Sequence, residues 1–190
     1  HEEGTRLGED PEELHDMRVA TRRMRAAFPI FQDYLDMTVM RPHLKGLRRT
    51  GRLLGTVRDL DVFYEKTQRY LDAQPPGREV DLQPLHSAWQ AQRDRTRAEM
   101  LAYLNGPRYQ RFVQEFAAIL QPEAFGQFAR LGAPDHPWPN LVRHVVPVAV
   151  YQRLAEVRAY NEWVARPDVP LDTLHQLRIA AKGFRYTMEF

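Results

Sequence analysis

Two similar segments near the ends of the chain constrain its fold more than any other feature. They read LHDMRVATRRMR at residues 14–25 and LHQLRIAAKGFR at residues 174–185. Each has a histidine in second place and basic residues three, seven and ten positions after it, with apolar residues at helical spacing. The repeat therefore predicts two helices that present the same side chains in the same order.

On a helix, the histidine and the three basic side chains of each copy share one face. At about 100° per residue they fall within an arc of roughly 80°. We call the two faces the first ridge (His15, Arg18, Arg22 and Arg25) and the second ridge (His175, Arg178, Lys182 and Arg185). The residues expected to face the core, opposite the first ridge, are Met17, Met24, Phe28, Phe31 and Leu35. No acid within either motif relieves the repulsion along its ridge, which costs a few tenths of a kcal/mol per pair. The pattern indicates an anionic ligand or acids from another helix.

The rest of the chain has the same helical character. Apolar residues recur every three or four positions, no segment alternates with period two, and Pro and Gly cluster in a few loops. The sequence predicts an all-α protein, with helices at about 11–36, 40–73, 82–104, 107–130, 139–164 and 171–190. Short loops favour a bundle. Pro29 is expected to kink or divide the first helix and Pro147 the fifth, whereas Pro11 and Pro107 suit a first helical turn.

The second predicted helix carries another basic face. Its four cations span an arc of about 100° and comprise Lys45, Arg48, Arg49 and Arg52. Gly46, Gly51 and Gly55 are unfavourable in a helix and predict close approach of another helix or of a ligand. Further along, Arg58 and Asp61 are expected to form a partly buried ion pair, or else to reach and orient a ligand.

Composition excludes several classes of protein. The 190 residues contain no cysteine, which excludes disulfide scaffolds, Cys-ligated zinc and thiol nucleophiles, and no apolar run is long enough to span a membrane. Net charge is only +2, yet residues 17–52 hold nine basic residues and two acids, and all but three of the 27 basic residues are arginines. Arginine presents a planar fork of donors that matches phosphate and carboxylate. Segregated arginine predicts a defined anionic ligand.

These elements resemble the CHAD family, which is named for conserved histidines in an α-helical domain. The resemblance is carried by the two His-Arg motifs and by the segment LGTVRDLDV at residues 54–62 between them. It implies two four-helix bundles related by a pseudo-twofold axis, with a basic central cleft that binds inorganic polyphosphate without catalysis. It also implies a cytoplasmic protein, in some members at polyphosphate granules or beside a triphosphate tunnel domain, with no cofactor, metal or membrane.

Carried over residue by residue, the resemblance implies ligand contacts at both ridges. The shared helix face of the second predicted helix adds four candidate contacts, Lys45, Arg48, Arg49 and Arg52. One departure is Gly183, which stands where the first copy has Arg23. The chain corresponds to the first half of the family's usual length plus one further helix. Residues 1–170 are thus expected to form the first bundle, and residues 171–190 the opening helix of a second, truncated bundle.

Other functions are less well matched. A nucleic-acid-binding module would use the same charges, but it usually adds aromatic side chains for stacking, and neither ridge arc contains one. A phosphate-processing enzyme would need a P-loop, carboxylates for Mg²⁺, or a nucleophile. Asp59 and Asp61 are candidate metal ligands, and His15 and His175 are candidates for covalent phosphorylation, but neither motif has an acid one turn away to orient the ring. No pair of histidines has the spacing of a metal site. We also expect Trp89, Trp138 and Trp163 in the core, and a solvated, salt-bridged face at Arg93, Arg95 and Arg97.

Overall fold

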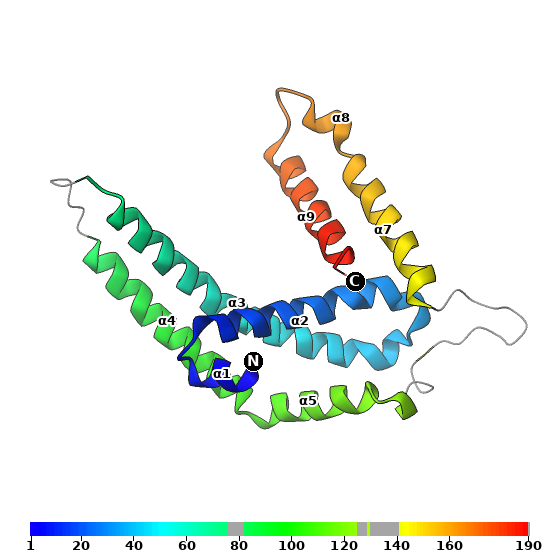
Figure 1. Cartoon of the computed structure of the whole chain (residues 1–190), viewed down its shortest axis with the longest axis horizontal. Coiled ribbons are helices and arrows are strands. Elements are labelled where there is room, and N and C mark those ends of the chain that lie inside the picture. The colour runs from blue at the N-terminus through cyan, green and yellow to red at the C-terminus, as the bar shows by residue number, and fades with distance from the viewer. Residues whose placement is uncertain (76–81, 125–128, 130–140, 190) are drawn as a thin grey trace, which may run out of the picture. The chain divides into compact units, whose positions relative to one another are not determined.

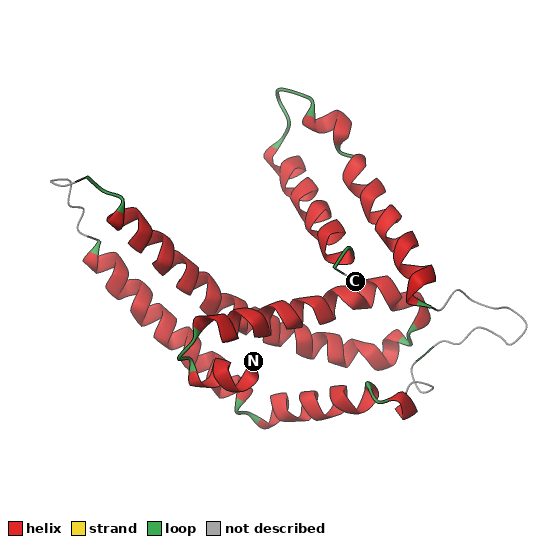
Figure 2. Cartoon of the chain, viewed as in Figure 1, coloured by secondary structure: helices red, strands yellow, loops and turns green. Residues whose placement is uncertain are grey.

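The computed structural model describes residues 1–75, 82–124, 129 and 141–189, and within them the chain is helical (Figures 1 and 2). The α-helices are α1 (Glu2–Leu7), α2 (Pro11–Phe31), α3 (Met37–Asp72), α4 (Gln83–Leu104), α5 (Pro107–Ile119), α7 (Val142–Arg158), α8 (Asn161–Val164) and α9 (Leu171–Thr187). Two short 3₁₀ turns span Gln32–Tyr34 and Pro122–Ala124. The described residues contain no strand, only an isolated bridge between Leu35 and Ala129. The all-α prediction is confirmed.

The prolines act largely as predicted. Pro11 and Pro107 are the first residues of α2 and α5, where a missing N–H costs nothing. The helix that contains Pro29 ends at Phe31 and continues as a 3₁₀ turn, so the predicted helix 11–36 is divided. In contrast, α7 continues past Pro147 to Arg158. The loop predicted before α7, at residues 132–139, lies outside the described residues.

The chain forms two compact units. Unit 1 comprises residues 1–22 and 42–120, and unit 2 comprises residues 23–41 and 121–190. Both α2 and α3 therefore contribute to each unit. These units differ in kind from the predicted bundles, which divide at residue 170 and refer to a longer fold. The assignment of residues 1–170 and 171–190 to two bundles stays a prediction.

The core of unit 1 lies where α2, α3, α4 and α5 meet. It consists of Leu14, Met17, Leu54, Val57, Met100, Leu104 and Tyr109. Four of these side chains (Leu54, Val57, Met100 and Leu104) are 0% exposed, and each contributes about 1.5–3 kcal/mol through burial. The core-facing side of α2 is confirmed at Met17 and Phe28, but Met24 is 38% exposed, so its assignment to the core was wrong.

Helix α1 was not predicted from the sequence, because six residues are too few to be stable alone. Contacts from distant residues hold it. The Arg97 guanidinium donates to the carbonyl oxygens of Arg6 and Leu7 at 2.9 and 3.1 Å, and the Tyr109 hydroxyl donates to Glu2 at 2.8 Å. Gly8 ends the helix with φ of 74°, a conformation that suits glycine. Burial and the bond to Glu2 raise the pKa of Tyr109.

In unit 2, α7 packs against α9 (Figure 1). Large apolar side chains remain exposed there, among them Val148 at 68% and Tyr151 at 72%. Trp163 is also exposed, at 46%, and its ring lies beneath the Arg166 guanidinium at 4.6 Å. Its assignment to the core was wrong, since the residue is exposed and its ring lies against a cation. Trp138 lies outside the described residues.

Candidate anion-binding groove

The four cations predicted on α3 border a groove within unit 1. Lys45, Arg48, Arg49 and Arg52 are exposed and line a volume of about 880 Å³. Helix α5 supplies two further cations to the same groove, Arg108 and Arg111, which the sequence analysis missed. They lie three residues apart directly after Pro107, so a helical reading of that segment could have found them.

A glycine on α3 allows α5 to come close. A methyl group at Gly46 would collide with the ring of Phe112, so the aromatic side chain fills the space that a Cβ would need. For Gly46, this confirms the predicted close approach of another helix. The turn before α5 is also tight, since a Cβ at Gly106 would lie 3.1 Å from the carbonyl oxygen of Ala102. Arg108 and Arg111 are thereby brought to the basic face of α3.

The groove has an aromatic floor. Arg49 lies over the Tyr103 ring at 5.0 Å, and the Tyr103 hydroxyl is 3.3 Å from the hydroxyl of Thr50. The Phe112 and Phe116 rings are stacked with 5.7 Å between their centroids. Tyr103, Phe112 and Leu53 are only partly buried and line the groove, so a ligand there meets apolar atoms as well as cations.

Few acids offset the charge of this groove. In the described part of the chain, the lining contains six Lys or Arg side chains and a single carboxylate, that of Glu115. Among the described residues, no carboxylate lies within ion-pair distance of the six cations lining the groove, Lys45, Arg48, Arg49, Arg52, Arg108 and Arg111. Clustered cations that are not paired with carboxylates produce a positive potential, which favours an anionic ligand.

A histidine closes one end of the groove. His43 is 7% exposed, and its ring lies 5.7 Å from that of Phe116. Burial lowers the pKa of His43 below its ordinary value of 6.5, and the nearby charge of Glu115 acts in the opposite direction. His43 therefore contributes an uncharged ring near neutral pH.

The first ridge is half-buried over most of its length. His15, Arg18 and Arg22 are partly covered in unit 1, whereas Arg25 is exposed in unit 2. The Nδ1 atom of His15 is buried and has no hydrogen-bond partner in the part of the chain that the structure describes. Arg18 lies along α3, with its Nε 3.6 Å from where a Cβ at Gly55 would stand. The ridge is therefore packed against α3 rather than fully solvated.

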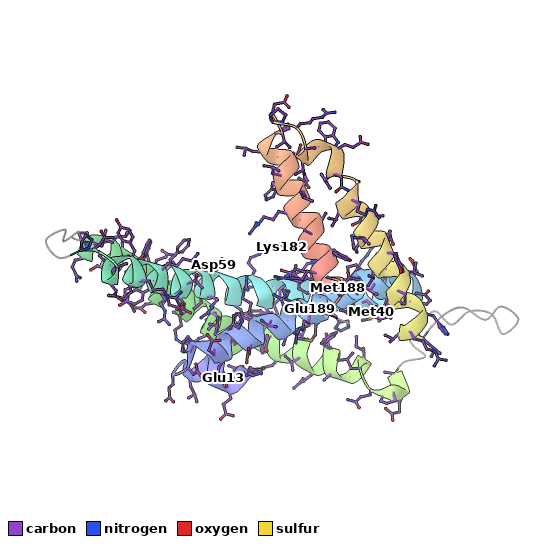
Figure 3. All side chains as sticks on the ribbon, turned by 45° about the horizontal axis from the view of Figure 1, so that its top comes forward. Glu13, Met40, Asp59, Lys182, Met188 and Glu189 are labelled. Carbon is purple, nitrogen blue, oxygen red and sulfur yellow. The ribbon has the colours of Figure 1, made fainter. Side chains whose placement is uncertain are left out.

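The second ridge is exposed. His175, Arg178, Lys182 and Arg185 all face solvent on α9, and in Figure 3 Lys182 projects away from the helix. Arg185 lies over the ring of Tyr186 at 4.9 Å, and its Nε is 4.0 Å from Glu189. Glu189 also lies 3.3 Å from Arg23, so one carboxylate contacts Arg185 of the second ridge and the neighbour of Arg22 in the first. The prediction that both ridges line a common cleft stays a prediction.

The ion pair expected between Arg58 and Asp61 is wrong. The Arg58 guanidinium instead lies 3.3 Å from Glu12 and 3.8 Å from Glu65, and Asp61 is bonded to Arg93 at 2.5 Å. Asp61 is only 8% exposed and pairs with Arg93 of α4, whereas Arg58 lies near Glu12 of α2 and Glu65 of its own helix.

The predicted solvated face on α4 is also corrected. Arg93 pairs with Asp61 and Arg97 holds the end of α1, so only Arg95 keeps to local partners on its own helix. Nor do Asp59 and Asp61 form a metal site. Asp59 is exposed, and no cluster of three or more potential ligands occurs among the residues that the structure describes.

None of the helices in the described part of the chain is long and apolar enough to cross a membrane. The architecture is thus that of a helical domain with arginine-rich helix faces. The chain belongs to the CHAD domain family, whose family model matches residues 1–190.

A similar solved structure is the CHAD domain from the plant Ricinus communis. The two share 25% sequence identity and superpose with a TM-score of 0.68. The match covers 99% of this chain and 58% of the plant chain, so this chain spans little more than half of that structure. No curated protein matches the chain.

Proposed function

We propose that this chain binds inorganic polyphosphate, without chemistry, through the groove between α3 and α5 and through the two ridges. The observation that carries the proposal is the convergence of six cations from two helices on one groove, with a single carboxylate among them. The family to which the chain belongs is associated with polyphosphate binding, which agrees with this ligand.

Charge and spacing both suit a linear polyanion. Successive turns of a helix place cations about 5.4 Å apart, so Lys45, Arg48 or Arg49, and Arg52 form a ladder along α3. An arginine side chain can donate two parallel hydrogen bonds to the oxygens of one phosphate, which makes the contact specific in geometry as well as in charge. Most of the affinity should come from counterion release and should therefore fall steeply with added salt.

The two ridges are further proposed contacts for polyphosphate. The side chains proposed to touch polyphosphate there are His15, Arg18, Arg22, Arg25, His175, Arg178, Lys182 and Arg185. His15 has a buried ring nitrogen without a partner, beside three arginines of the same face. In a family whose members include larger chains, a neighbouring triphosphate tunnel domain and a location at cytoplasmic polyphosphate granules are further parts of this proposal.

A binding role is favoured over catalysis because the groove lacks the groups that phosphoryl transfer needs. Its lining has one carboxylate, Glu115, whereas Mg²⁺-dependent transfer uses several oxygen ligands. An enzyme would release orthophosphate from polyphosphate in a Mg²⁺-dependent manner, and we expect no such release.

The test is a titration at physiological salt with long-chain polyphosphate, single-stranded DNA and duplex DNA at equal phosphate concentration. We expect polyphosphate to bind most tightly, and tighter binding of either DNA would overturn the proposal in favour of a nucleic-acid-binding module. Arg52→Glu and Arg108→Glu should each weaken polyphosphate binding by about 1–3 kcal/mol. Lys66→Glu is the matched control, since Lys66 is an exposed cation of α3 that does not line the groove.

A further inference from the structure

The groove between α3 and α5 is more than a row of cations. A chain of bare phosphates gains nothing from apolar surface, yet Leu53, Tyr103 and Phe112 contribute side chains to the lining. A volume of about 880 Å³ also falls in the range of pockets that bind small organic ligands, roughly 300–1,000 Å³. These features suit an anion that carries an apolar or aromatic group.

Contacts between the helices give the groove a direction. Arg49 of α3 lies over Tyr103, Gly46 meets Phe112, and His43 lies against Phe116. Residues with lower numbers on α3 therefore contact residues with higher numbers on α4 and α5, so the helices run in opposite directions along the groove. This register places Arg52 and Arg108 toward one end of the groove, and Glu115 toward the other.

Charge follows the same direction. The end near Arg49 and Arg52 is cationic, whereas the end near Glu115 combines one cation, Lys45, with the carboxylate of the described lining and the uncharged, buried His43. A carboxylate in this place repels a phosphate but accepts hydrogen bonds from an amino group. Phe112 lies between the two ends, and its ring is only partly buried.

From this arrangement we propose that the groove binds a nucleoside polyphosphate. The phosphates contact the arginines near Arg52, the base stacks on Phe112, and an amino group of the base donates to Glu115. Stacking of a base on an aromatic side chain adds affinity that phosphate contacts cannot supply. The inference does not depend on binding of long-chain polyphosphate, although both ligands would meet the same arginines.

The decisive comparison is between ATP and tripolyphosphate, measured by isothermal titration calorimetry without divalent cations. Tripolyphosphate carries more negative charge, so charge alone would make it the tighter ligand. We expect ATP to bind about tenfold more tightly, because stacking of one base on an aromatic side chain is typically worth a factor of roughly five to a hundred. Equal or tighter binding of tripolyphosphate would overturn the proposal.

Two substitutions separate the base from the phosphates. Phe112→Leu keeps the apolar volume but removes the aromatic face, and it should weaken ATP about tenfold while tripolyphosphate stays within about twofold. Phe63→Leu is the control, since Phe63 is an exposed aromatic residue of α3 outside the groove. Equal losses for both ligands in Phe112→Leu would contradict a stacking role.

Glu115→Gln provides a second readout that does not touch the aromatic floor. Removal of the negative charge should strengthen tripolyphosphate binding and leave ATP binding unchanged or weaker. An equal gain for both ligands would show that no base lies at Glu115. If polyphosphate binds and ATP does not, only this inference fails. If ATP binds and polyphosphate does not, only the proposed function fails.

Discussion

The two copies of the His-Arg motif have the same helical pattern but different surroundings. In α2, the first three members of the ridge are half-buried, Met17 lies in the core, and Arg18 passes over Gly55 of α3. In α9, all four ridge residues are exposed, and Gly183 has nothing within 4 Å of where its Cβ would be. The difference shows that a repeated pattern specifies a helix face, whereas the helices packed around it decide how far that face is covered.

The largest expected contrast concerns the apolar side of the two helices. Met17→Ala should lower the free energy of unfolding by about 2–5 kcal/mol, because it leaves a cavity in the core of unit 1. Leu177→Ala, at the matching position of α9, should cost only about 1 kcal/mol, since Leu177 is partly exposed. Chemical denaturation measures both. Equal losses would show that the two copies are equally buried.

Charge reversal on the ridges tests whether both copies bind the ligand. Arg22→Glu and Lys182→Glu should each weaken polyphosphate binding by about 1–3 kcal/mol, as expected for loss of a charge-assisted contact. Lys182→Glu should leave stability within about 0.5 kcal/mol of the parent, because the side chain is exposed, whereas Arg22→Glu should cost more. A double variant that binds as well as the parent would exclude the ridges from the site.

The glycines sharpen the comparison further. Gly183→Ala should stabilise the chain by about 0.5–1 kcal/mol, since it removes backbone freedom from the unfolded state and meets no neighbour. Gly46→Ala is the matched contrast and should destabilise, because the new methyl group would displace Phe112. Thermal unfolding of the two variants should therefore shift in opposite directions. A stabilising Gly46→Ala would mean that α5 does not depend on this close approach.

The smallest expected effect is a pH dependence from His43. The folded-state pKa of His43 lies below its ordinary value of 6.5, so in the window just under pH 6.5 the unfolded chain binds more protons than the folded one. The free energy of unfolding should therefore fall as pH is lowered through this window. Above the window, His43 is uncharged in both states and the free energy of unfolding should not change with pH on its account. His43→Gln should flatten this part of the stability curve. An unchanged slope would show that His43 is already solvated.

Much of the fold could be predicted from helical spacing, proline positions and the cationic faces. The arc of Lys45, Arg48, Arg49 and Arg52 proved to line one groove because all four project from one side of a continuous helix. The ion pairs could not be predicted in the same way. Spacing along α3 pointed to Arg58 with Asp61, but Arg58 pairs with Glu12 of α2 and Asp61 with Arg93 of α4, and a pattern within one segment cannot reveal such contacts.

The amino-acid sequence by itself determined where most of the helices lie, which faces of α2, α3 and α9 are basic, and that the motif occurs twice. These properties depend on neighbours three or four positions apart, so they are local. Only the tertiary structure decided that α5 joins the groove with Arg108 and Arg111, that α1 is held by Arg97 and Tyr109, and that the first ridge is half-buried over most of its length while the second is exposed. Each of these depends on contacts between residues far apart in the chain, such as Gly46 with Phe112, where the absence of a single methyl group lets two helices meet.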